Sequence, residues 1–205
     1  KLIDIVSTSG AKTLSLAGGD PLLRRDILTL TNFAHELGLR VEIQTNGHAL
    51  NADGLEALMH CHRVCLSLDG STAELHDSIR RRRGNFKRVV AVADELAAQN
   101  VPISVRTVIT NENRTDVKHL AALVSSFKSC DRWTLLEFTP VNDGFKNRAD
   151  YEMSGADFEA AVAEVREEYQ GTATIDVFRN RNKVGAYLQI TSDGHVYGET
   201  NSALN

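Results

Sequence analysis

Hydrophobic positions along the chain alternate between two spacings, one typical of strands and the other typical of amphipathic helices. Apolar runs that predict strands lie at 13–17, 40–45, 64–68, 103–109, 133–138 and 172–178. Apolar residues three and four apart predict helices at 1–10, 21–37, 53–59, 85–98, 115–127 and 156–169. Because strands alternate with helices at this spacing, the sequence predicts right-handed β-α-β units and an α/β fold around a parallel sheet.

The last part of the chain has a different pattern. Two short strands at 187–191 and 195–197 flank Ser192-Asp193-Gly194, which predicts a β-hairpin. The longest irregular connection lies at 141–154 and is a candidate lid or insertion. We therefore expect one domain over 1–184, with a hairpin extension over 185–205 packed on it.

Composition argues against several classes of protein. The 205 residues carry a net charge of −4, which argues against nucleic acid as a partner. The longest apolar run, at 89–93, is far too short to span a membrane, and no signal-peptide pattern opens the sequence. The three cysteines form no even disulfide framework, so we expect a reducing compartment and a cytoplasmic protein.

Glycine and polar residues gather where four of the predicted strands end. These segments are 18–21 (Gly-Gly-Asp-Pro), 44–47 (Gln-Thr-Asn-Gly), 67–70 (Ser-Leu-Asp-Gly) and 106–107 (Arg-Thr). In α/β folds the carboxyl ends of parallel strands share one edge, and ligands bind there. Neither a Gly-x-Gly-x-x-Gly motif nor a Walker motif follows a strand, so phosphate sites of those two types are absent.

The residues at each of these strand ends can also be explained by the local structure alone, without a ligand. The glycines at 18–19 open the backbone to a ligand and Asp20 suits an ammonium group, but a tight turn with a helix N-cap explains the same residues. Similarly, short hydroxyl, amide and carboxylate groups suit ribose hydroxyls, whereas Asn-Gly at 46–47 and Asp-Gly at 69–70 are common turn pairs. Local chemistry alone leaves both interpretations open.

Three further features carry charge or metal-ligand chemistry. Arg106 lies in an apolar strand and needs an anionic partner, either a ligand or a protein carboxylate such as Glu137. The segment 60–62 (His-Cys-His) and Cys65 are metal-ligand residue types, but they span a helix end and a strand, so we expect no metal site. The arginine run 80–83 favours a solvated loop over a phosphate-binding one.

Taken in order, the strand-end motifs resemble those of the radical S-adenosylmethionine (radical SAM) enzymes. They are Leu14-Ser-Leu-Ala-Gly-Gly-Asp-Pro21, Ile43-Gln-Thr-Asn-Gly47, Cys65-Leu-Ser-Leu-Asp-Gly70, His76-Asp-Ser-Ile-Arg80 with Gly84-Asn-Phe86, and Arg106-Thr-Val-Ile-Thr-Asn-Glu-Asn113. The tail at 188–198 is similar to the hairpin after the barrel in the GTP 3′,8-cyclase, SPASM and viperin-like groups. The resemblance implies a partial TIM-type (β/α)6 barrel that lacks its first strand and cluster loop and ends in a β-hairpin.

The resemblance also implies a SAM site beside a [4Fe-4S] cluster. In the family, an electron from the cluster cleaves SAM, and the 5′-deoxyadenosyl radical abstracts a substrate hydrogen. The residues it implies for SAM are Gly18, Gly19, Asp20 and Pro21 at the methionine ammonium, Thr45 and Asn46 near SAM or substrate, Ser67 and Asp69 at the ribose or carboxylate end, Arg106 at the carboxylate, and Phe138 and Thr139 at the adenine. It assigns no catalytic residue and no metal ligand within this chain.

The sequence departs from the family at the cluster. No Cys-x3-Cys-x2-Cys loop is present, so we expect the cluster ligands upstream of residue 1 and a chain that is part of a longer one. Cys61 and Cys65 share the first spacing, but no third cysteine follows them. Ser15 replaces the arginine of the GTP cyclases, which weakens GTP as the substrate, and Glu199 replaces the cysteine of an auxiliary cluster.

The resemblance implies a small-molecule, peptide or nucleotide substrate and an electron donor such as flavodoxin or ferredoxin. Two other functions stay open. One is a non-catalytic, degenerate barrel that binds SAM or a protein partner. The other is an unrelated TIM-barrel isomerase or aldolase, which would need a lysine or carboxylate base at a strand end, whereas Lys146 and Lys183 lie elsewhere.

Overall fold

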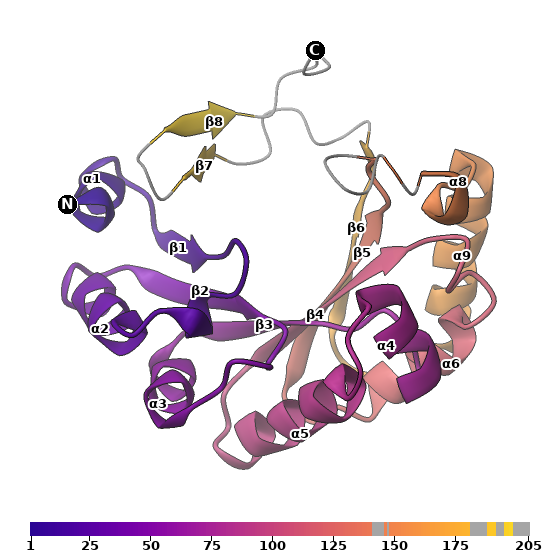
Figure 1. The fold of residues 1–205 in the computed structure, drawn as a ribbon, viewed down its shortest axis with the longest axis horizontal. Coiled ribbons are helices and arrows are strands. Elements are labelled where there is room, and N and C mark those ends of the chain that lie inside the picture. Colours follow the sequence, from indigo (N-terminus) through magenta and orange to yellow (C-terminus); the bar gives the residue numbers. More distant parts are fainter. Residues whose placement is uncertain (141–145, 147, 181–187, 192–194, 199–205) are drawn as a thin grey trace.

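A computed structural model describes residues 1–140, 146, 148–180, 188–191 and 195–198 of the chain. Its central feature is a six-stranded sheet in which every neighbouring pair is parallel and the strands follow chain order, β1-β2-β3-β4-β5-β6. Figure 1 shows the sheet as an open arc. The strands are β1 (Thr13–Leu16), β2 (Arg40–Thr45), β3 (Arg63–Ser67), β4 (Ile103–Ile109), β5 (Cys130–Glu137) and β6 (Thr174–Phe178).

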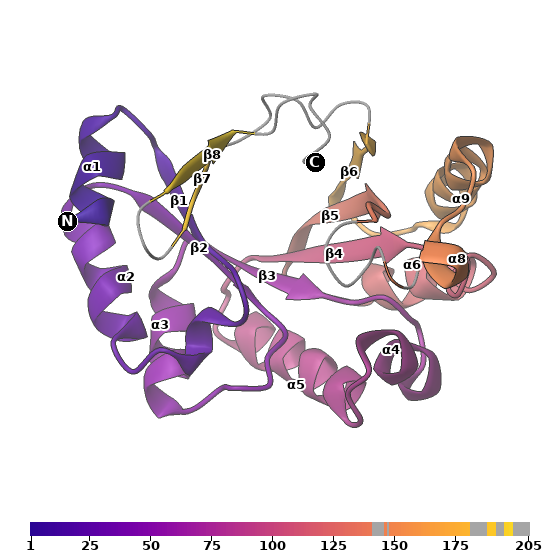
Figure 2. The ribbon, with the colours of Figure 1, turned by 45° about the horizontal axis from the view of Figure 1, so that its top comes forward.

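Helices cover the convex face of this arc, and the concave face lies on the other side of the sheet (Figures 1 and 2). The helices are α1 (Leu2–Thr8), the short 3₁₀ helix η1 (Pro21–Leu23), α2 (Ile27–Glu36), α3 (Ala52–His60), α4 (Ala73–Arg80), α5 (Asn85–Ala98), α6 (Val117–Ser125), α8 (Arg148–Tyr151) and α9 (Gly155–Glu168). The predicted fold class, an α/β partial barrel, is therefore confirmed.

Side chains alternate between the two faces of each strand, and the faces differ in chemistry. On β2, Val41 and Ile43 are completely buried in the hydrophobic core, whereas the intervening Glu42 and Gln44 are partly exposed. Strands β3 and β4 place other apolar residues in the same core. The concave face therefore carries the polar half of the sheet, which is the surface available to a ligand.

Most predicted elements are present, and β2, β4 and α5 have the predicted bounds. The prediction is wrong for the helix at 21–37. Asp20 does act as an N-cap, but it caps only η1, and the backbone of Arg24 is extended. The next helix begins at Ile27, and Leu23, assigned to the apolar face, is 73% exposed. The predicted helix is therefore interrupted at Arg24, whose side chain pairs with Asp26 at 2.8 Å.

The remaining differences are smaller. Helix α4 was recognised only as a motif, and α3 is capped by Asn51 rather than started by Asp53. The tail forms the predicted antiparallel pair, β7 (Leu188–Ile190) and β8 (Val196–Gly198), while its turn at 192–194 lies outside the described residues. Most of 141–147 also lies outside them, and the helix α8 follows. The division between 184 and 185 stays a prediction.

No helix among the described residues is both long enough and apolar enough to cross a membrane.

Candidate functional site

The turn after β1 is fixed by the carboxylate of Asp20, which is 8% exposed. One oxygen accepts from the Leu22 N–H at 3.0 Å, and the Thr45 hydroxyl donates to the carboxylate at 2.8 Å. The Asn46 N–H donates to it at 3.2 Å. Asp20 therefore ties the end of β1 to the end of β2, and it brings together three of the residues that the resemblance implies.

The two glycines of this turn have backbones that a ligand can reach. Gly18 has φ +83° and Gly19 has φ +46°, a conformation that side chains disfavour. A Cβ placed on either residue would have no heavy atom within 4 Å, so the space beside both is open. Pro21, which follows Asp20, is buried and donates no N–H. The turn thus leaves open space beside its glycine backbone and carries a carboxylate, Asp20, which suits a cationic group.

The end of β3 is fixed by a second buried carboxylate, Asp69, whose side chain is 3% exposed. Its Oδ1 accepts from the N–H of Val108 on β4 at 2.8 Å, and its Oδ2 forms an ion pair with Arg80. Its backbone carbonyl accepts from the side chain of the buried Asn113 at 3.0 Å. The Asn113 Oδ1 in turn accepts from the Thr110 N–H at 2.8 Å. These contacts tie the end of β3 to the end of β4.

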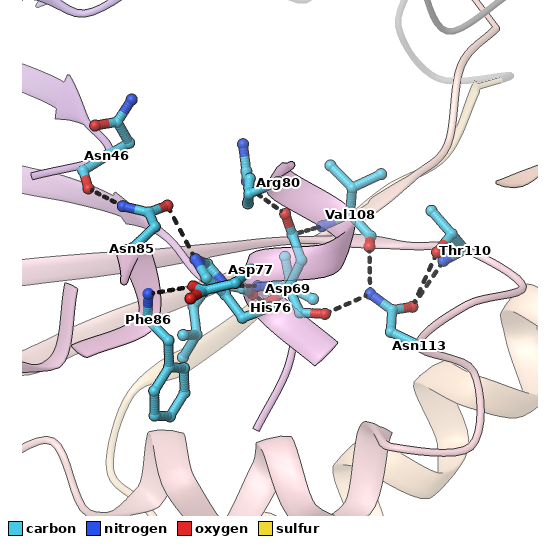
Figure 3. Close-up of polar contacts among 12 residues, drawn as sticks. Asn46, Asp69, His76, Asp77, Arg80, Asn85, Phe86, Val108, Thr110 and Asn113 are labelled. Carbon is cyan, nitrogen blue, oxygen red and sulfur yellow. Dashed lines mark hydrogen bonds and ion pairs between the residues drawn. The ribbon is translucent and has the colours of Figure 1, made fainter. Parts of the chain in front are cut away.

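A completely buried histidine, His76 of α4, connects the two halves of this rim (Figure 3). Its Nδ1 accepts from the Asp69 N–H at 3.1 Å, which makes Nε2 the donor to Asn85 Oδ1, also at 3.1 Å. The side chain of Asn85 then donates to the Asn46 carbonyl at 2.8 Å. Burial lowers the pKa of His76, so the imidazole is held neutral. We call Asp69, His76, Asn85 and Asn113 the rim network.

One row of residues on the concave face crosses the sheet below this rim. Ser67, the last residue of β3, is level with Arg106 of β4, and Arg106 is level with Thr134 of β5. In a parallel sheet, residues in register point to the same face. Ser67 and Arg106 are both partly exposed there. The row therefore places a hydroxyl and a guanidinium side by side on the face that a ligand would enter.

The guanidinium of Arg106 has no ion pair or hydrogen bond with any residue that the structure describes. Its Nε is inaccessible to solvent and has no acceptor. The protein carboxylate considered for it, Glu137, accepts instead from the Asn180 N–H at 2.7 Å. A buried donor without an acceptor is costly, so this geometry fits an anionic group of a ligand.

The two residues expected near the adenine lie at the end of β5. The Thr139 hydroxyl donates to Asn180 Oδ1 at 2.6 Å, and Asn180 donates to the Phe138 carbonyl at 2.9 Å. The Phe138 ring packs on Tyr151, with ring centroids 5.6 Å apart. Among the described residues, no hydrogen bond joins this group to the rim network. It forms a separate end of the rim.

The cysteines do not fit an iron–sulfur cluster. Cys61, Cys65 and Cys130 are all buried. Burial raises the pKa of Cys61 to about 12 and that of Cys130 to about 11, whereas a cluster needs thiolates. The described residues contain no group of three or more cysteine, histidine or carboxylate side chains that could hold a metal ion. The described part of the chain therefore supplies no set of cluster ligands.

Two surface depressions in the described part lie away from this rim. One is lined by Asn32, His35 and Glu36 of α2 together with His60 of α3. The other lies between α5 and the loop that follows α6. Both are on the convex, helical side, far from the row of Ser67 and Arg106. The candidate site is therefore located by the unpaired guanidinium of Arg106 rather than by a surface depression.

Sequence comparisons identify the family. The profile of the Radical SAM superfamily matches residues 1–124. The chain is 33% identical over 184 residues to a PqqA peptide cyclase of Ruegeria pomeroyi, covering 86% of this chain and 48% of the relative. It is 31% identical over 159 residues to an AdoMet-dependent heme synthase of Methanosarcina barkeri, covering 77% of this chain and 44% of that one. The chain belongs to the radical SAM superfamily, which is a superfamily of enzymes.

A comparison of structures agrees on the fold. The crystal structure of Streptococcus suis SuiB bound to the precursor peptide SuiA superposes with a TM-score of 0.73 at 17% identity. The match covers 87% of this chain and 40% of SuiB. The chain thus spans about half the length of the curated relatives it matches, or less.

Hydrogen bonds at the rim connect four of the eleven site residues that the resemblance implies, namely Asp20, Thr45, Asn46 and Asp69. Hydrogen bonds run without a break from Asp20 through Asn46 and on to Asp69, so three strand ends form one unit. No role for His76, Asn85 or Asn113 follows from the sequence alone. His76 and Asn85 belong to one of the strand-end motifs, but one partner of Asn85, Asn46, lies 39 residues away in the sequence. Their role is visible only in the folded chain.

Proposed function

We propose that this chain is the SAM-binding part of a radical SAM enzyme. The observation that carries the proposal is the unpaired guanidinium of Arg106, which lies level with Ser67 on the concave face of a radical SAM fold. A partly exposed arginine whose buried Nε has no protein acceptor is suited to the carboxylate of an amino-acid ligand. When bound and given one electron by a [4Fe-4S] cluster, SAM would yield methionine and the 5′-deoxyadenosyl radical that abstracts hydrogen from a substrate.

Each strand end has a proposed role in holding SAM. Arg106 binds the methionine carboxylate through charge-assisted hydrogen bonds. The open backbone of Gly18 and Gly19 faces the methionine ammonium, and the contacts of Asp20 with β2 fix the direction of that turn. Ser67 contacts the ribose or carboxylate end.

The other residues of the proposed site shape its edges. Thr45 and Asn46 hold the turn after β1 through Asp20, close to SAM or substrate. Asp69 positions the end of β3, and Phe138 and Thr139 border the adenine. Pro21 completes the first turn by removing an N–H donor next to the ammonium. These assignments complete a site that runs from β1 to β5.

A first experiment separates SAM binding from SAM cleavage. The purified protein is supplied with iron, sulfide, SAM and dithionite under anaerobic conditions, and 5′-deoxyadenosine is measured together with SAM binding by equilibrium dialysis. We expect saturable binding but no 5′-deoxyadenosine, because the three buried cysteines cannot serve as cluster ligands. A protein that bound no SAM would contradict the proposed function, and one that made 5′-deoxyadenosine would contradict the account of the cysteines.

We further propose a peptide as the substrate and a flavodoxin or ferredoxin as the electron donor. The name of one relative, PqqA peptide cyclase, supports a peptide. A non-catalytic barrel that binds SAM remains the second candidate, favoured by the burial of all three cysteines. A longer form of the protein that carries a Cys-x3-Cys-x2-Cys loop separates the two, because only the enzyme would then produce 5′-deoxyadenosine from SAM.

A further inference from the structure

Four consecutive arginines begin with Arg80, the last residue of α4, and the proposed SAM site uses none of them. Arg80 pairs with Asp69, but Arg81, Arg82 and Arg83 are exposed, and within the described part of the chain their side chains have no ion pair or hydrogen bond. We call these three residues the arginine turn. The segment 69–88 holds six basic and three acidic side chains, although the whole chain carries a net charge of −4. The turn is therefore a local positive patch on an acidic protein.

This turn is held in one conformation by its backbone. The carboxylate of Asp77 accepts from the N–H groups of Gly84 and Phe86, which lie directly after the turn. Burial raises the pKa of Asp77, but these N–H groups outweigh it, so the pKa lies below its usual value and the acceptor stays charged. In addition, the Arg82 N–H donates to the Asp77 carbonyl at 2.9 Å. The backbone that carries the three arginines is thus held in one conformation, so their side chains but not their backbone lose freedom on binding.

Arg81 adopts a conformation that usually selects glycine. It has φ +50° at the C-cap of α4, and the only other residue of this kind in the described part, apart from glycines, is Asn100. Glycine is the common residue in this left-handed position because a side chain makes it strained. An arginine here gives up stability, and strain of this kind concentrates at functional sites.

The arginine turn lies at the rim where the proposed SAM site opens. The next residue but one, Asn85, donates to the Asn46 carbonyl at the end of β2. The residue before the turn, Arg80, contacts Asp69 at the end of β3, as Figure 3 shows. An anion bound at the turn would therefore be anchored beside the entrance to the concave face.

We propose that the arginine turn binds an acidic stretch of a peptide substrate, through carboxylate side chains of aspartate or glutamate. Guanidinium groups match carboxylates with two parallel hydrogen bonds, and the patch has the opposite charge to such a peptide. This inference rests on the proposed function, because it takes a peptide as the substrate. In this proposal the arginine turn selects which peptide binds, and it takes no part in SAM binding.

The test uses a fluorescein-labelled octapeptide with three glutamates, its glutamine counterpart and ATP as a phosphate probe. Anisotropy titrations of the protein are expected to show binding of the glutamate peptide, at least tenfold weaker binding of the glutamine peptide, and weaker binding at high salt. A triple variant, Arg81→Gly with Arg82→Ala and Arg83→Ala, should bind the glutamate peptide at least about tenfold more weakly. The matched control removes three exposed basic side chains elsewhere, Arg40→Ala, Lys128→Ala and Arg166→Ala, and should change the affinity less than about twofold.

Arg81→Gly alone gives a sharper readout, because affinity and stability should move in opposite directions. The variant should bind the peptide about threefold more weakly and melt about 2 °C higher, since glycine relieves the left-handed strain. Unchanged peptide affinity in the triple variant would overturn the proposal, as would an equal loss in the control variant. Tighter binding of ATP than of the peptide at the turn would overturn it in favour of a phosphate site. SAM binding, measured on the same triple variant, should be unchanged, so a failure here is distinguishable from a failure of the SAM site.

Discussion

The rim network and the row of Ser67 and Arg106 lie next to each other but differ in how their polar groups are used. In the rim network, the buried His76 and Asn113 have hydrogen-bond partners on neighbouring strand ends. In the row, Arg106 has a buried Nε without an acceptor. The motifs that mark a strand-end site therefore contain two kinds of residue. One kind holds the loops together, and the other is left free for a ligand.

A second contrast lies within the concave face itself. Toward the starts of the strands, Arg63 pairs with Glu42 at 2.7 Å and with Asp131 at 2.8 Å. Arg132 also pairs with Asp176, at 3.3 Å. Further along the sheet, Arg106 has no such partner in the described part. On the concave face, the arginines near the starts of the strands are thus paired with carboxylates. Arg106, nearer the strand ends, is left to pair with the proposed ligand.

The largest expected effect comes from removing the centre of the rim network. His76→Ala deletes a buried side chain and leaves the Asp69 N–H and the Asn85 Oδ1 without partners. We expect the free energy of unfolding to fall by about 3 kcal/mol, from the cavity and the unpaired groups together. Urea denaturation of the variant and the parent protein measures this. A loss below about 1 kcal/mol would show that the rim is not held by His76.

The second prediction compares two arginines of the concave face. Arg106→Ala should weaken SAM binding by about tenfold or more without lowering the free energy of unfolding, because it breaks no hydrogen bond or ion pair with a described residue and removes a buried Nε–H that has no acceptor. Arg63→Ala should do the reverse: stability should fall by about 1 kcal/mol, a figure reduced for the partial exposure of its partners, and SAM binding should hold. Calorimetry of both variants measures their stability and their affinity for SAM, the two quantities that the prediction compares. Equal effects on the two properties would remove the distinction between structural and ligand-binding charge.

The smallest expected effect is a pH dependence of stability. Because burial lowers the folded-state pKa of His76, the unfolded chain takes up its proton first as the pH falls. The contribution of the neutral His76 to the free energy of unfolding is fully present above the ordinary histidine pKa near 6.5. It is lost as the pH falls below that value, and the free energy of unfolding then changes by at most about 1.4 kcal/mol per pH unit. Asp69, Asp77 and Arg80 face the same ring, and only Arg80 lowers its pKa further.

The measurement is a series of denaturation curves between pH 5 and 8 on the parent protein and on His76→Gln. The variant should lose part of the slope, and His48→Gln, which changes an exposed histidine outside the rim network, should retain it. An identical slope in all three proteins would show that His76 is not the titrating group.

Much of the fold follows from local patterns, and the exceptions have physical causes. The bounds of β2 and β4 are predictable because apolar and polar residues alternate along them. The start of α2 is not predictable in this way, because an N-cap at Asp20 followed by Pro21 is also the pattern of a helix that continues, whereas this one ends after Leu23.

The candidate site was predictable only in part. Strand-end motifs identify which residues gather at the rim, including Asp20, Asn46 and Asp69. They do not distinguish a free group from a bound one, because the partners lie 25 to 39 residues away in the sequence. Whether Arg106 pairs with Glu137 depends on strand register, which the sequence left open.

The most direct test of the account is a titration of the ¹⁵N-labelled protein with SAM, followed by NMR on backbone amides and on the arginine Nε–H groups. The account predicts saturable shifts of the Arg106 Nε–H together with the amides of Gly18, Gly19 and Ser67. Shifts confined to the convex, helical side, or an Arg106 signal that does not move while SAM binds, would contradict it.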